Sequence, residues 1–215
     1  SLVKIESKAD VTINGAGGAI KNTETANTNK TLNEHAIEAA GGSTLTVNNT
    51  TIEGNAGVCF GYTDTVKEGT TENTNVTLKN CSIKTTSRDN DCAAITSNGY
   101  DTVGGTLVVD GCTVTGKDGK VEGMYLPGAH NVTVKNGTTV EGTTAISIKA
   151  GTLKVTDTCK LTATAENYKA PNPSSLATNG SDVSGAVIGI FDQTPPYATM
   201  SKVEVDSTVT LTVTA

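Results

Sequence analysis

The feature that most constrains the fold is a short sequence motif of alternating apolar and polar residues that recurs along the chain. It is clearest at residues 131–161, where apolar runs beginning at Val132, Val140 and Ala145 each end in Asn, Asp or Gly. The motif begins again at Leu153, 21 residues after Val132. Alternation over runs this short is typical of half-buried strands and not of helices. A repeat of this length is about the size of one coil of a solenoid.

The motif contains three classes of predicted strand, and each class recurs along the chain. The first class is an apolar-x-apolar pair, found at Val3/Ile5, Leu45/Val47, Val76/Leu78, Leu107/Val109, Val132/Val134, Leu153/Val155 and Val203/Val205. The second class follows seven or eight residues later, at Val11, Ile52, Ile83, Val114, Val140, Leu161 and finally Val209 or Leu211. The third class is a small-apolar step, at Ala36-Ile37, Val58-Cys59, Ala94-Ile95, Met124-Tyr125, Ala145-Ile146 and Val187-Ile188.

Three strands per repeat with no helix between them predict an all-β fold. We expect a single-stranded parallel β-helix of about seven coils, right-handed because β-crossovers almost always are. The composition suits this fold, because only 3% of the residues are aromatic and a narrow β-helix bore needs few large side chains. The pattern predicts one domain over residues 1–215, with inserted loops at 14–33 and 163–184. Since the pattern is already under way at Ser1, we expect the chain to be a fragment of a longer surface protein.

Two positions of the repeat have an expected structural role. The turn after the first strand places one residue of each coil where a sharp, left-handed bend is needed, and these residues are Asn49, Asn80, Gly111, Asn136 and Asp157. A neighbouring position predicts an inward slot for small side chains, occupied by Ala9, Thr50, Cys81, Cys112, Thr138 and Cys159. The five cysteines lack metal-ligand spacing, so buried thiols are expected rather than zinc ligands or a disulfide framework.

The charge of the chain excludes some classes of partner. A formal net charge of −6 argues against nucleic acid and against anionic membrane surfaces, since both are bound through basic patches. No stretch of 18 apolar residues occurs, so no membrane-inserted helix is expected.

Acidic residues in the loops after the second strand form the best candidate metal site. Asp89 and Asp91 belong to one coil, and Asp118 and Glu122 belong to the next, so the repeat predicts all four on one side of the helix. Carboxylate oxygens are the ligands that Ca²⁺ prefers, which makes calcium the expected cofactor. The competing interpretation is that these are solvated acids, with Arg88 forming an ion pair with one of them.

Tyrosines in or beside the loops after the third strand are the candidate sugar contacts. A tyrosine ring stacks on a sugar face while its hydroxyl binds a sugar hydroxyl, and the candidates, together with Arg88, are Tyr62, Tyr100, Tyr125 and Tyr197. Tyr125 is also expected to be partly in the core, because the alignment places it in the slot of Ile146. His35 and His130 lack partners at catalytic or metal spacing, and surface or turn positions are expected for both.

The segment from Met124 to Leu153 resembles Thr/Gly-rich right-handed β-helix proteins of the surfaces of gut and other anaerobic bacteria, in the pectate-lyase-like superfamily. The resemblance covers Leu45 to about Ile190. Related domains bind acidic plant polysaccharide with calcium and do not cleave it. The resemblance therefore implies a non-catalytic, extracellular or cell-surface module, a carbohydrate-binding domain or adhesin, whose partner is a polysaccharide or a host or plant glycan.

Two alternatives stay open. A polysaccharide lyase or glycoside hydrolase would need Arg88, Lys117 or Lys120 to meet the loop aspartates in one cleft. The paired motifs of pectin hydrolases (Asn-Thr-Asp, Asp-Asp and Gly-His-Gly) are absent from the sequence, so no catalytic residue is assigned. The other alternative is a structural shaft without a ligand, whose repeats serve only to extend the molecule.

Overall fold

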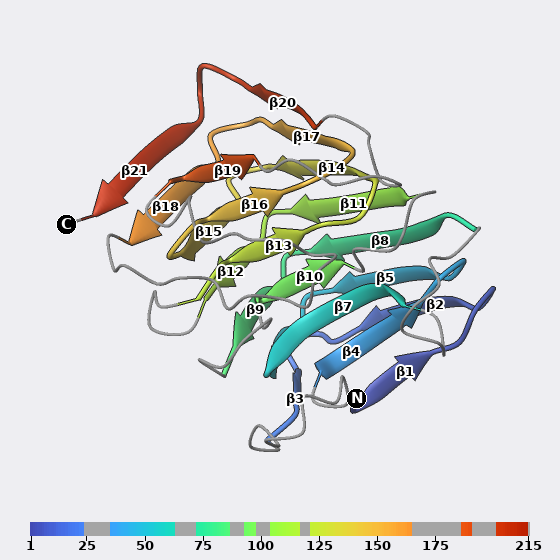
Figure 1. Cartoon of the computed structure of the whole chain (residues 1–215). Coiled ribbons are helices and arrows are strands. Elements are labelled where there is room, and N and C mark those ends of the chain that lie inside the picture. The colour runs from blue at the N-terminus through green and yellow to red at the C-terminus, as the bar shows by residue number, and fades with distance from the viewer. Residues whose placement is uncertain are drawn as a thin grey trace.

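The chain coils into a parallel β-helix, seen in a computed structural model that describes residues 1–23, 35–62, 72–86, 93–97, 104–116, 121–164, 186–190 and 201–214. Its strands form three parallel sheets of seven strands each, so the prediction of about seven coils is confirmed. Figure 1 shows the coils stacked in sequence order, with the N-terminal and C-terminal coils at opposite ends.

The three sheets are here named A, B and C. Sheet A contains, in spatial order, β1 (Val3–Ile5), β4 (His35–Ala40), β7 (Ala56–Tyr62), β10 (Ile95–Ser97), β13 (Met124–Leu126), β16 (Ile146–Ile148) and β19 (Ile188–Ile190). Sheet B contains β2 (Asp10–Asn14), β5 (Thr44–Asn48), β8 (Thr74–Lys79), β11 (Gly105–Asp110), β14 (His130–Lys135), β17 (Thr152–Val155) and β20 (Lys202–Val205). Sheet C contains β3 (Ala19–Lys21), β6 (Thr51–Gly54), β9 (Ser82–Thr85), β12 (Thr113–Thr115), β15 (Thr139–Gly142), β18 (Lys160–Thr164) and β21 (Thr210–Thr214).

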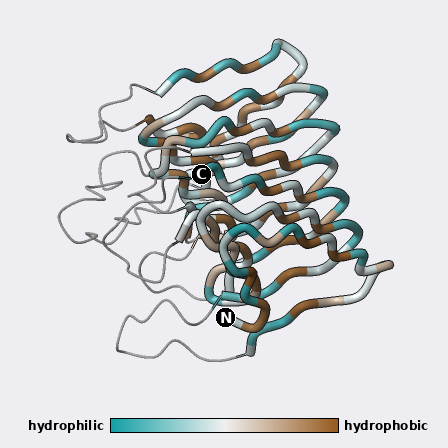
Figure 2. Tube along the Cα trace, turned by 90° about the vertical axis from the view of Figure 1, so that its right-hand side faces the viewer, coloured by the Kyte–Doolittle hydropathy of each residue, from teal (hydrophilic) through white to brown (hydrophobic). Residues whose placement is uncertain are grey.

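The core is a set of apolar columns that run along the helix axis. In sheet B, Leu45, Val76 and Leu107 are paired in register on neighbouring strands, and all three are fully buried. Along each strand, the residues that alternate with these inward ones point outward and are mostly polar. Figure 2 shows the resulting alternation of hydrophobic and hydrophilic residues along the strands. Because each coil buries its apolar residues against the coils on either side, small aliphatic side chains are enough to fill the bore.

The predicted left-handed turn is confirmed in five consecutive coils. Its φ angle lies between 51° and 62° in every case, at Asn49, Asn80, Gly111, Asn136 and Asp157. A left-handed backbone brings Cβ close to the following carbonyl oxygen, and Asn, Asp and Gly tolerate this better than other residues. The left-handed conformation of this turn therefore explains why Asn, Asp and Gly recur at one position of the repeat.

The inward slot after this turn is also confirmed, with one correction. Thr138 donates a hydrogen bond from Oγ1 to the carbonyl of Lys135 at 2.7 Å and accepts one from the N–H of Cys112 at 3.1 Å. Cys112 is buried in the same slot, and its thiol lies 3.3 Å from the carbonyl of Leu78. Cys59, Cys81, Cys112 and Cys159 are free and buried, whereas Cys92 lies outside the described residues.

The correction concerns the first coil, in which each of the first two predicted strands belongs to a different sheet from the one expected. Val3 pairs with Ile37, so β1 belongs to sheet A, and Val11 pairs with Leu45, so β2 is the first strand of sheet B. Alternation alone cannot distinguish two strands of the same pattern, and only their pairing shows which sheet each belongs to. Ala9 consequently precedes β2 instead of occupying the slot of Thr50.

The stretch at 14–33, expected to be an inserted loop, contains a strand. β3 spans Ala19–Lys21 and pairs with β6 through Ala19 with Thr51 and Ile20 with Ile52. The sequence pattern hid it because the preceding turn is longer than the others and moves the apolar Ile20 away from its expected spacing. The residues at 24–34, and most of the second expected loop at 163–184, lie outside the described residues.

Sheet A corrects the predicted register of the third strand class. Ile95 pairs with both Val58 and Met124, so Tyr125 pairs with Ser147 and not with Ile146. A shift of one residue moves a side chain to the other face of a sheet. Tyr125 therefore points outward, and the expectation that it lies partly in the core is wrong.

The expected surface or turn positions of the two histidines are wrong as well. His35 and His130 are both buried. The ring of His130 meets that of Phe60 edge to face, with the ring centroids 4.7 Å apart. An aromatic contact of this geometry stabilises the core beyond the burial of apolar surface.

Candidate functional site

Most of the predicted ligand and metal residues lie outside the described part of the chain. This applies to Arg88, Asp89, Asp91, Tyr100, Asp118 and Tyr197. Tyr62 ends β7, but its side chain is not described either. The structure therefore tests only the positions of Glu122 and Tyr125 among the predicted site residues.

Glu122 and Tyr125 belong to one coil and both lie beside Ser147, an outward-facing serine of sheet A in the next coil. Ser147 donates a hydrogen bond from Oγ to Oε1 of Glu122 at 2.6 Å and is the register partner of Tyr125. The ammonium group of Lys149 lies 5.2 Å from the centroid of the Tyr125 ring, within range of a cation–π interaction. Lys149 is 1% exposed, so this contact is shielded from water. Tyr125 thus has one ring face near a cation.

The described residues contain no group of three or more His, Cys, Asp or Glu side chains that could hold a metal ion. The same part of the chain contains no helix long and apolar enough to cross a membrane.

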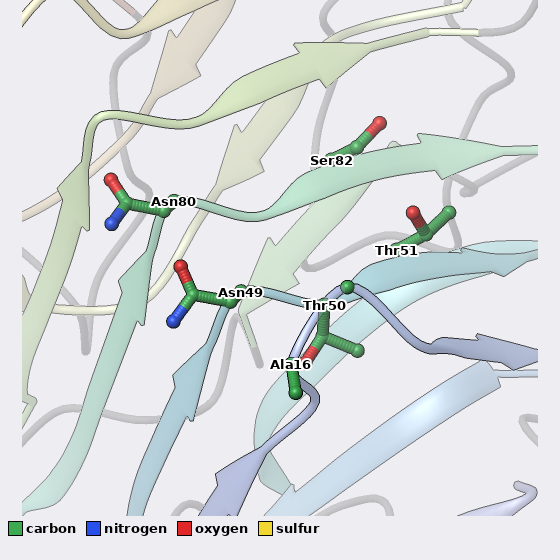
Figure 3. Close-up of a pocket in the computed structure, with 7 residues that line it drawn as sticks. Ala16, Asn49, Thr50, Thr51, Asn80 and Ser82 are labelled. Atoms are coloured by element: carbon green, nitrogen blue, oxygen red, sulfur yellow. The ribbon is translucent and has the colours of Figure 1, made fainter.

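An open hollow at the corner between sheets B and C is the best candidate site among the described residues. It has a volume of about 470 Å³ and is lined by Ala16, Gly17, Asn49, Thr50, Thr51, Asn80 and Ser82. Figure 3 shows the amides of Asn49 and Asn80 projecting side by side from consecutive turns, with Thr51 and Ser82 on the strands that follow. None of the lining residues is ionisable, so the polar side-chain groups of the hollow are amides and hydroxyls.

The first coil builds one wall of the hollow. Its corner has two residues more than the corner of the second coil, and Ala16 and Gly17 sit at its tip with φ angles of 44° and 87°. The N–H of Gly17 donates to the carbonyl of Asn49 at 2.8 Å, which attaches this projecting turn to the second coil. A Cβ atom on Gly15 would lie 2.2 Å from Oγ1 of Thr50, so only glycine allows so close an approach.

The polar groups of the hollow differ in their freedom to bind a ligand. Thr50 is buried and donates to the carbonyl of Asn48 at 2.9 Å, which makes it a structural part of the floor. Thr51 and Ser82 are register partners on the outward side of β6 and β9. Asn49 and Asn80 are exposed, and each amide has two donor hydrogens and an acceptor oxygen. The hollow therefore offers donors and acceptors at several fixed points.

A row of charges borders the hollow along sheet C. Glu53 forms ion pairs with Lys84 at 3.0 Å and with Lys21 at 3.3 Å. Burial raises the pKa of Glu53, but the hydrogen bonds and charges of Lys84 and Lys21 outweigh it, and the net pKa lies below its usual value. The carboxylate of Glu53 is thus shared between two lysines, and one positive charge of the three groups remains beside the hollow.

Sequence reasoning identified Asn49 and Asn80 as turn residues and missed that they line a hollow. The available signal was the longer first corner, Gly15-Ala-Gly-Gly18, which the alignment of coils counted as part of a loop. An outward column of hydroxyls was also missed. It runs along sheet C from Thr51 through Ser82 and Thr113 to Thr139, one residue from each of four consecutive coils.

Comparison of the chain with protein-family models, with curated proteins and with solved structures finds no match.

Proposed function

We propose that this chain is a non-catalytic carbohydrate-binding module that binds a glycan in the hollow between sheets B and C. The observation that carries the proposal is the lining of the hollow. Two exposed asparagine amides and two outward hydroxyls line it, and none of the lining residues carries a charge. Sugar hydroxyls both donate and accept hydrogen bonds, as amides and serine or threonine hydroxyls do.

The surroundings of the hollow support a chain-like ligand over a single sugar. The hydroxyl column of Thr51, Ser82, Thr113 and Thr139 leads away from the hollow along the helix axis. Neighbouring strands of a sheet are about 4.8 Å apart, so the column offers a regular series of polar contacts to an extended polymer. A glycan seated at Asn49 and Asn80 would extend over these coils.

The wider proposal includes the setting that the resemblance implies. The chain would belong to an extracellular or cell-surface protein of a bacterium, in the pectate-lyase-like β-helix superfamily, and act as an adhesin or as a binding domain for plant or host polysaccharide. Calcium held by Asp89, Asp91, Asp118 and Glu122, with sugar contacts from Arg88 and the four tyrosines, would form a second contact region beyond the hollow.

Affinity electrophoresis through gels that contain neutral or acidic polysaccharides tests the proposal. We expect retarded migration on at least one polysaccharide. Retardation that survives a calcium chelator would assign binding to the hollow, and retardation that the chelator abolishes would assign it to the acidic loops. Unretarded migration on every gel would contradict glycan binding and favour the structural shaft.

A matched pair of double variants locates the site. Asn80→Gly with Ser82→Ala removes one amide and one hydroxyl from the hollow and leaves the left-handed turn free of strain. Asn136→Gly with Thr133→Ala removes one amide and one outward hydroxyl two coils further along, away from the hollow and outside the hydroxyl column. We expect the first variant to weaken binding about tenfold or more and the second to retain most of it. Equal effects of both variants would contradict a site in the hollow.

A further inference from the structure

The inward slot that follows the left-handed turn places two cysteines side by side in consecutive coils. Cys81 and Cys112 occupy this slot, and the residues that follow them, Ser82 and Thr113, pair in register. Both cysteines are free, and only 3% and 2% of their surfaces are exposed. The slot therefore brings two thiols together inside the bore of the helix.

The successive slots form a column along the helix axis, here called the slot column, in which the other thiol stands apart. The register of the residues that follow each slot gives the order of the column as Thr50, Cys81, Cys112, Thr138, Cys159 and Val209. Cys159 thus has threonine on one side and valine on the other. Cys81 and Cys112 are the one pair of neighbouring thiols in the slot column.

The two cysteines of this pair are in direct contact. The backbone N–H of Cys81 donates to the sulfur of Cys112 at 3.4 Å, and the two side chains are hydrogen-bonded to each other. An N–H donor aimed at a sulfur atom stabilises a thiolate there. The contact therefore favours a pair of sulfur ligands over two independent apolar side chains.

The backbone around the pair tolerates the loss of both thiol protons. The sulfur of Cys81 lies 3.3 Å from the carbonyl oxygen of Lys79, and the sulfur of Cys112 lies 3.4 Å from that of Asp110. The carbonyl of Lys79 also accepts the N–H of Asn49 at 2.9 Å. Similarly, the carbonyl of Asp110 accepts an N–H at 2.8 Å from the turn between the two coils. Both carbonyls consequently keep a partner when the thiols are deprotonated.

The spacing of the coils suits a metal ion between the sulfurs better than a disulfide. Neighbouring strands are about 4.8 Å apart, whereas a disulfide requires Cβ atoms about 3.5–4.5 Å apart. A metal–thiolate bond is about 2.3 Å long, so an ion in line between two sulfurs spans about 4.6 Å. Zinc takes four ligands in a tetrahedron, and the described residues provide no group of three or more metal-binding side chains. Cu(I) is a soft ion that prefers thiolates and accepts two of them.

We propose that Cys81 and Cys112 together bind one Cu(I) ion between two consecutive coils. Each thiol releases one proton to solvent, two copper–sulfur bonds form, and the oxidation state of the copper does not change. The site lies directly inside the corner formed by Asn80, an exposed residue that precedes Cys81 in the chain, so opening of one turn admits the ion. This inference does not depend on the proposed glycan site.

Titration of the fully reduced protein with Cu(I) under anaerobic conditions tests the proposal. The protein competes with bicinchoninate, a coloured Cu(I) chelator, and is used both folded and after refolding with the metal. We expect one equivalent of copper to be retained, and X-ray absorption at the copper edge to show two sulfur neighbours only. Failure of both preparations to retain copper, or nitrogen or oxygen neighbours of the bound ion, would overturn the proposal.

A matched pair of threonine variants locates the site. Threonine is the residue that the repeat itself uses at Thr50 and Thr138, so Cys112→Thr and Cys159→Thr both fit the slot. We expect Cys112→Thr to lower the affinity for Cu(I) at least about 100-fold, more than the loss of an outer partner of a metal ligand. Cys159→Thr should retain the affinity, because Cys159 has no neighbouring thiol in the slot column. Equal affinities of the two variants would overturn the proposal.

A third variant extends the pair. Thr138→Cys joins Cys112 and Cys159 into four consecutive thiols, and we expect it to retain at least one further equivalent of Cu(I). Thr133→Cys, on the outward side of sheet B, adds a thiol away from the slot column and should leave the stoichiometry at one. The same gain in both variants would contradict a site that depends on stacked thiols. Circular dichroism of all variants establishes that each retains the β-helix.

Discussion

At the scale of single residues, Glu53 shows how outward positions of a β-helix contribute to stability. Its carboxylate lies between Lys21 and Lys84, and its pKa is lowered because their hydrogen bonds and charges outweigh the effect of burial. An acid whose pKa is lower in the folded state stabilises the fold above its unfolded pKa of about 4.3, and this contribution is lost as the pH falls through the folded pKa.

We expect Glu53→Gln to reduce the free energy of unfolding at neutral pH by up to about 1 kcal/mol, because the lysines are half-exposed and solvent screens the pairs. The difference from the parent protein should disappear as the pH falls through the lowered pKa of folded Glu53, as measured by urea denaturation across pH. Glu141→Gln is the control, since Glu141 lies in the same column between Thr115 and Thr162. A Glu53→Gln effect that persists at low pH would assign it to packing instead of charge.

At the scale of the structural element, the turn from sheet B to sheet C depends on a polar atom inside the core. Oγ1 of Thr138 donates to Lys135, and the same atom accepts from the N–H of Cys112. Thr138→Val keeps the shape and leaves the buried N–H of Cys112 without this partner, whereas the carbonyl of Lys135 still accepts from the N–H of Gly111, so we expect a loss of about 1–3 kcal/mol in the free energy of unfolding. Thr138→Cys should lose less, because the neighbouring coils use cysteine in this slot. Equal losses in the two variants would show that the hydrogen bonds contribute little.

The same element shows how far the sequence predicts this fold. Features that all coils share recur at a fixed spacing in the sequence. The number of coils, the left-handed turn and the thiol slot could therefore be predicted from that spacing. The sheet to which β1 and β2 belong and the register of Tyr125 could not be predicted, because they depend on which residues of neighbouring strands pair. Gly57 and Gly123 come directly before the inward residues Val58 and Met124 of sheet A, and a Cβ at either glycine would clash with Ile83 or Val140. Recognising this shared position would have placed Tyr125 correctly. The hollow was missed for a similar reason, since it arises from two extra residues in one corner.

At the scale of the whole molecule, stability should vary along the helix axis. Each coil contacts only its neighbours, so a coil at an end is held from one side and a central coil from both. The last coil illustrates this, because β21 is exposed along its whole length whereas the inward residues of β11 and β14 are buried.

We therefore expect hydrogen exchange at low protein concentration to be slowest in β8, β11 and β14 and fastest in β20 and β21. The central amides open only when several coil interfaces are lost together, whereas the last coil detaches by losing one. Mass spectrometry of peptic peptides measures this gradient, and the free outer edge of β21 should exchange faster than the backbone of β18. Uniform exchange along the chain would instead indicate that the coils unfold as one cooperative unit.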